Sequence, residues 1–116
     1  MPAQFRPLEQ IADDPTVEVG DMLMVRGNIG SEGSQLVPVF YAGLDIYVSD
    51  GSAGLKKGKE FPGIRVFHKF DSQGRPQVGE HRASVFYDCH KGLLIPFSGA
   101  TKNEYALVAK ARDIPR

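Results

Sequence analysis

The chain contains a single cysteine, Cys89, and no tryptophan among its 116 residues. One cysteine cannot form an internal disulfide, so the fold has to be held by its hydrophobic core. No apolar run approaches the roughly 20 residues of a membrane-spanning helix, and the first residues have no apolar stretch of signal-peptide length. We therefore expect a protein of the cytoplasm or of a particle assembled there, not one secreted by a signal peptide.

Net charge is absent too, because 14 lysines and arginines balance 14 aspartates and glutamates. A chain without net charge has no overall attraction to nucleic acid or to an acidic membrane surface. Copies of such a chain repel one another only weakly, so self-association costs little electrostatically. The charge balance thus argues against nucleic acid as a partner, and no membrane partner is expected.

The chain is rich in turn-forming residues, with 13 glycines and eight prolines. Between them lie short segments rich in Val, Ile, Phe and Tyr, and no segment has the periodicity of an amphipathic helix. The sequence therefore predicts an all-β fold, a small barrel or sandwich of about eight short, mostly antiparallel strands. We expect these strands at 16–19, 22–28, 35–42, 44–51, 64–70, 75–78, 81–88, 92–97 and 105–113.

Residues 1–15 differ from the rest, because three prolines fall among them and resist helix formation. We expect an extended N-terminal arm with at most one helical turn, followed by a single β domain at 16–116. The arm carries three apolar anchors, Phe5, Leu8 and Ile11. Two alternatives stay open for them: they bind a neighbouring subunit, or they cover an open face of their own domain.

Several predicted strands carry apolar residues on both faces, which a half-exposed sheet should not do. A covering loop or a partner molecule must bury the second face. With the arm and the zero net charge, this pattern favours a non-enzymatic structural or interaction module, a subunit of a homo-oligomer or of a larger particle. A virion decoration or connector-type protein is one instance, by analogy only. The expected partner is the chain itself or another protein of the assembly, and no cofactor is expected.

The segment YDCHKG, residues 87–92, is the first candidate for catalytic chemistry, because it holds the only cysteine between an aspartate and a histidine. The alternative function is a small-ligand-binding or hydrolytic enzyme domain. Its pocket would be lined by His68, His81, Asp88, Cys89 and His90. A Cys–His nucleophile needs the imidazole within hydrogen-bond reach of the sulfur, which adjacent residues rarely achieve, and the spacing lacks the close ligand pairs of a zinc site. Because Gly92 ends the segment between two apolar runs, we interpret it as a hairpin turn and predict no catalytic or metal-binding residue.

A weaker alternative is a nucleic-acid-binding barrel. Lys56, Lys57 and Lys59 lie in a predicted loop, and Phe61 follows closely in the sequence. Lysines beside aromatic platforms are typical of β-barrels that bind single-stranded nucleic acid. A solvated lysine loop explains the same residues more simply.

Overall fold

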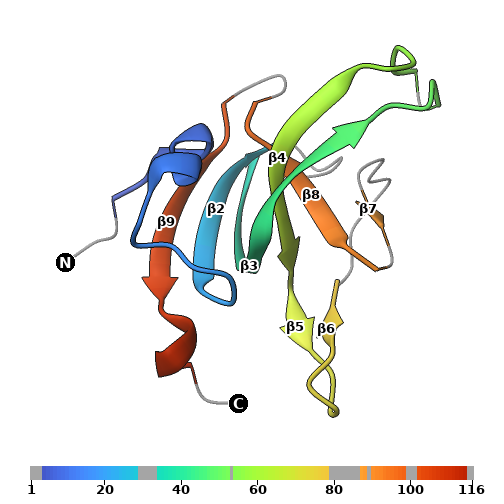
Figure 1. Ribbon diagram of the computed structural model, residues 1–116. Coiled ribbons are helices and arrows are strands. Elements are labelled where there is room, and N and C mark those ends of the chain that lie inside the picture. Colours follow the sequence, from blue (N-terminus) through green and yellow to red (C-terminus); the bar gives the residue numbers. More distant parts are fainter. Residues whose placement is uncertain are drawn as a thin grey trace.

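The computed structural model describes residues 4–28, 34–52, 54–78, 87–88, 90–98 and 102–114. Within these residues the chain forms nine strands and two 3-10 turns (Figure 1). In chain order they are β1 (Arg6–Pro7), η1 (Leu8–Asp13), β2 (Met22–Asn28), β3 (Ser34–Val48), β4 (Glu60–Phe67), β5 (Lys69–Phe70), β6 (Pro76–Gln77), β7 (Tyr87–Asp88), β8 (Gly92–Pro96), β9 (Glu104–Ala109) and η2 (Ala111–Asp113).

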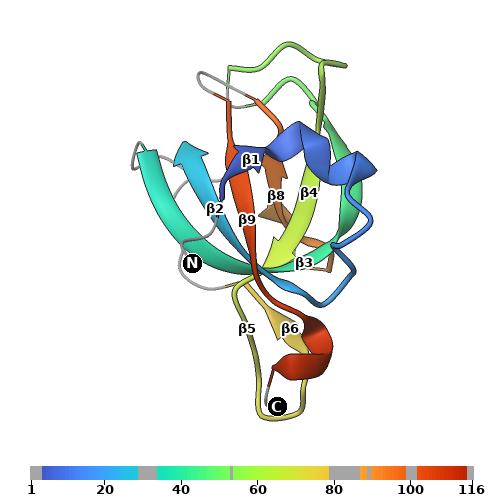
Figure 2. The ribbon, with the colours of Figure 1, turned by 90° about the vertical axis from the view of Figure 1, so that its left-hand side faces the viewer.

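Seven of these strands form one sheet in the order β1-β9-β2-β3-β4-β8-β7, and every pair is antiparallel. The long strands β2, β3 and β4 follow one another as a meander, and β9 returns to lie beside β2. A separate hairpin consists of β5 and β6. Figure 2 shows how strongly the large sheet curls. The expected all-β fold of about eight mostly antiparallel strands is confirmed.

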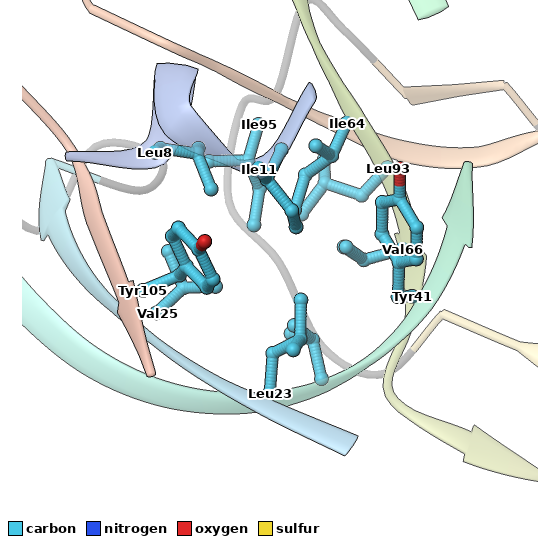
Figure 3. Packing of buried hydrophobic residues seen from close by; sticks show 11 residues of the cluster. Leu8, Ile11, Leu23, Val25, Tyr41, Ile64, Val66, Leu93, Ile95 and Tyr105 are labelled. Carbon is cyan, nitrogen blue, oxygen red and sulfur yellow. The ribbon is translucent and has the colours of Figure 1, made fainter. Parts of the chain in front are cut away.

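The curled sheet encloses one hydrophobic core (Figure 3). Alternation along β2 decides which side chains reach it: Leu23 and Val25 are fully buried, whereas Arg26 on the other face is exposed. The turn η1 lies over the same core. The buried cluster comprises Leu8, Ile11, Leu23, Val25, Val39, Tyr41, Ile64, Val66, Leu93, Ile95 and Tyr105.

Two of the three arm anchors belong to this core. Leu8 is fully buried and Ile11 nearly so, while Phe5 is half-buried and lies 4.1 Å from the guanidinium of Arg26. The backbone amide of Leu8 donates a hydrogen bond of 2.8 Å to the carbonyl of Asn103. Of the two alternatives for the arm, this burial favours the one in which it covers its own domain.

The predicted strand at 16–19 is wrong, because these residues form turns and irregular backbone. A carboxylate oxygen of Asp14 accepts the amide of Thr16 at 2.9 Å, and one of Asp21 accepts the amide of Glu18 at 2.8 Å. Aspartate side chains that bind nearby amides compete with strand pairing. That competition outweighs the β propensity of Thr16 and the valines.

The predicted strand at 105–113 is right only in its first part, because β9 ends at Ala109 and η2 follows. The buried carboxylate of Asp21 ends the strand pairing there, since it accepts the amide of Ala111 at 2.8 Å. The segments expected at 35–42 and 44–51 are one strand, β3. Of the strand expected at 81–88, only residues 87–88 lie within the described part of the chain.

Candidate interaction surface

A long hairpin made of β3 and β4 projects beyond the curled body of the sheet (Figure 1). β3 changes partners along its length, pairing with β2 as far as Phe40 and with β4 from Phe40 onwards. A register shift between Tyr41 and Gly43 accompanies the change, and Gly43 has a φ of 115°. Such a bulge bends a strand and increases its twist, which directs the second half of β3 away from the body.

One face of the projecting hairpin is apolar and exposed. Leu44, Ile46 and Val48 alternate along β3 and are 53%, 47% and 55% exposed. They lie on the core side of the sheet, because Leu44 pairs directly with the fully buried Ile64. These three residues, called the hairpin face below, therefore continue the core side of the sheet past the end of the core. Grouped exposed apolar residues of this kind mark interaction sites.

The other face of the hairpin is fixed by a largely buried ion pair. The Nε of Arg65 lies 2.8 Å from Oδ2 of Asp45, and another guanidinium nitrogen donates to the carbonyl of Gly92 at 3.0 Å. The hydrogen bond from Arg65 holds the pKa of Asp45 below its usual value. Because Arg65 spans from β3 to β8, it anchors the base of the hairpin to the body.

The tip of the hairpin is basic and ordered by its own hydrogen bonds. Lys56, Lys57 and Lys59 are all exposed. The amide of Ser49 donates to the carbonyl of Lys59 at 2.9 Å, and that of Lys59 donates to the carbonyl of Lys56 at 3.1 Å. The loop thus holds three lysines at the end of the hairpin face. The ammonium group of Lys59 lies 5.1 Å from the ring centroid of Phe61.

Two residues of the predicted pocket, His81 and Cys89, lie outside the described residues. Asp88 accepts the amide of His90 at 2.7 Å and that of Lys91 at 3.0 Å, which lowers the pKa of Asp88. β7 and β8 pair on either side, so the interpretation of residues 87–92 as a hairpin turn is confirmed.

His68 lies between β4 and the small β5–β6 hairpin, where its amide donates to the carbonyl of Gln77 at 3.0 Å. Among the described residues, no group of three or more His, Cys, Asp or Glu side chains could hold a metal ion. Because His81 and Cys89 lie outside the described residues, the predicted pocket stays a prediction.

A groove of about 640 Å³ is lined by residues of β3, β5, β6 and η2, among others. The β5–β6 hairpin and η2 lie at the lower end of the molecule in Figure 1. The lining of the groove is mainly apolar and includes none of the five residues of the predicted pocket: Val19, Gly20, Phe40, Tyr41, Ala42, Phe67, Phe70, Pro76, Ala111 and Arg112. Phe40 and Phe70 meet edge to face with ring centroids 4.9 Å apart. The groove is thus an apolar surface at the opposite end from the hairpin tip.

The apolar alternation of the hairpin face is visible in the sequence, where Leu44, Ile46 and Val48 alternate with Asp45 and Tyr47. Alternation alone does not say which face is buried. Only the pairing of Leu44 with Ile64, together with the end of the core at that point, leaves the apolar residues exposed.

No protein-family model matches the chain, and neither a curated protein nor a solved structure matches it. No helix in the described part of the chain is both long enough and apolar enough to cross a membrane.

Proposed function

We propose that the chain is a non-enzymatic interaction module that assembles with further copies of itself through the hairpin face. The observation that carries the proposal is the exposure of about half of each side chain, Leu44, Ile46 and Val48, on a strand held rigid by the Arg65–Asp45 ion pair. Burying such a row against a partner removes apolar surface from water, at roughly 25 cal/mol per Å².

A second copy is the occupant that the charges favour. The chain has no net charge, so copies meet without overall repulsion. The exposed apolar residues also lie on an ordered sheet face, which needs little further ordering on binding.

The test is the mass in solution, measured by light scattering over a range of concentrations, for the wild type and two matched variants. Leu44→Ser removes an apolar side chain from the hairpin face. Leu36→Ser is the control, because Leu36 lies on the same strand and is 57% exposed, but faces away from the core side. We expect the wild type and Leu36→Ser to associate alike, and Leu44→Ser to need about tenfold more protein to reach the same mass.

A wild type that stays monomeric at every concentration would overturn the proposal. So would equal association of all three proteins.

A second candidate is single-stranded nucleic acid, favoured by the placement of Lys59 against Phe61 and by the pair of rings Tyr47 and Phe61, whose centroids are 6.3 Å apart. It predicts that a labelled single-stranded oligonucleotide binds at low salt, and that about two decades of affinity are lost per tenfold increase in salt if three lysines contact phosphates. If the fluorescence anisotropy of the labelled oligonucleotide does not change when protein is added at low salt, nucleic-acid binding is excluded.

A further inference from the structure

We propose that the hairpin of one copy docks head to tail on the acid-rich N-terminal segment of the next copy, residues 9–19, and on the apolar groove that begins at Val19. This inference rests on the proposed function and adds to it the receiving surface and the geometry of assembly.

The docking end of the hairpin is positively charged. Residues 49–60 contain three lysines and two acidic residues, Asp50 and Glu60. Lys56, Lys57 and Lys59 are all exposed at the end of the hairpin, and Lys59 lies over Phe61, on the face opposite the hairpin face. A partner that covers the hairpin face up to this end therefore meets positive charge at its rim, and unpaired charges at an interface lower its affinity.

The N-terminal segment has the opposite charge. Residues 4–21 contain five carboxylates and one arginine. Three of the carboxylates act within the chain: Asp14 binds Thr16 and Tyr105, Asp21 is buried against Lys110, and Glu18 lies 3.8 Å from the ammonium group of the same lysine. Glu9, Asp13 and Glu18 are exposed.

An apolar surface adjoins one of these acids. Val19 follows Glu18 directly, is 67% exposed, and lines the groove with the rings of Phe40 and Phe70. Glu18 thus places a carboxylate for the lysines beside apolar contacts for the hairpin face, in a groove that Arg112 also lines.

The two surfaces lie apart in the molecule. In Figure 1 the hairpin tip projects at the upper right, while η1 lies at the left and the groove elements β5, β6 and η2 lie at the bottom. A contact that joins different surfaces of two identical subunits leaves one of each surface available for the next subunit. Assembly therefore continues into a closed ring or an open chain.

The test is a charge swap. One variant carries Lys56→Glu, Lys57→Glu and Lys59→Glu, and the other carries Glu9→Lys, Asp13→Lys and Glu18→Lys. We expect each variant alone to associate at least about tenfold more weakly than the wild type, because like charges then face each other. Mixing the two variants restores opposite charges at every contact, so the mixture should recover mass by light scattering.

A third variant, with glutamate in place of Lys91 and Lys102, is the control. These lysines are exposed as well and belong to neither proposed surface, so the variant acquires negative charge while the hairpin and the groove keep their own. It should associate like the wild type at moderate salt, where charges beyond about 10 Å are screened. Circular dichroism and thermal unfolding of each variant show whether it is folded.

The outcomes separate the two proposals. If Leu44→Ser weakens association but the charge variants do not, the hairpin face is the interface and the acidic segment is not its partner. If the charge variants weaken association and their mixture fails to recover it, the head-to-tail contact is overturned as well. A monomeric wild type would overturn both proposals.

Discussion

Two carboxylates hold the first part of the chain to its last strand. Asp14 accepts the hydroxyl groups of Thr16, at 2.6 Å, and of Tyr105. Asp21 is fully buried, and although burial raises its pKa, hydrogen bonds from Lys110, Glu18 and Ala111 outweigh that effect and lower it. A buried carboxylate is tolerated only when it is bonded in this way. Each of the two carboxylates therefore has fewer contacts with water, and its hydrogen bonds link distant segments of the chain instead.

The pair Asp14 and Tyr105 predicts a loss of stability at alkaline pH. Burial, and then the hydrogen bond to Asp14, raise the pKa of Tyr105 from 10.0 to about 12. A raised folded-state pKa gives stability that is complete below the unfolded-state pKa and is lost as the pH rises through the folded-state value. We expect the free energy of unfolding to fall by about 2–3 kcal/mol between pH 10 and 12 because of this group.

Denaturant titrations at several pH values measure this slope. Tyr105→Phe should remove most of it, since phenylalanine has no proton to lose. A variant whose stability falls with pH as steeply as that of the wild type would contradict the assignment.

At the scale of the elements, β4 and β8 approach so closely that one position has no room for a side chain. A Cβ atom added to Gly63 would lie 2.1 Å from the carbonyl oxygen of Ile95. We expect Gly63→Ala to lower the free energy of unfolding by about 3 kcal/mol, because the strands must separate to admit the methyl group. Urea denaturation measures the difference.

The matched control is Gly58→Ala in the hairpin loop. An added Cβ at Gly58 meets nothing within 4 Å, although the φ of +85° is strained for alanine. That strain costs about 1 kcal/mol. Equal losses in the two variants would show that the close approach of β4 and β8 does not limit position 63.

Some elements could be read from the sequence and others could not. The strand expected at 22–28 is β2, and that expected at 92–97 is β8 to within one residue, because alternation or a bounded apolar run fixes such segments locally. The strand expected at 16–19 failed because side chains bind its amides instead. The continuity of β3 depends on which strand pairs with each half, and no local pattern carries that information.

The candidate interaction surface, too, could be predicted from local sequence patterns only in part. The three lysines could be predicted to lie in a loop, because glycines surround them. Exposure of the hairpin face could not be predicted, since it depends on where the core ends relative to β3. Nor could the sequence show that Leu8 and Ile11 reach the core of their own chain.

At the scale of the whole molecule, the arm can be tested as part of the fold. Leu8→Ala removes a fully buried side chain, so we expect it to lower the free energy of unfolding by about 3 kcal/mol and to leave the mass in solution unchanged. Chemical denaturation and light scattering measure the two quantities. Leu36→Ala is the control, because a residue that is 57% exposed should change stability by less than about 0.5 kcal/mol.

The opposite pattern, a change in mass without a change in stability, would show that the arm anchors contact a neighbouring subunit. A lower free energy of unfolding together with a lower mass in solution would show that the arm contributes to both the fold and the assembly.

The hydrogen bonds from Tyr105 to Asp14 and from Lys110 to Asp21 join residues 91 and 89 positions apart. A ribosome that adds about 5–20 residues per second needs roughly 5–20 s to span that distance. During this interval Leu8 and Ile11 have been synthesised, but the strand that carries Tyr105 has not. The nascent chain therefore exposes these apolar side chains until β9 has been synthesised, and we expect chaperones to bind the emerging N-terminal segment during that time.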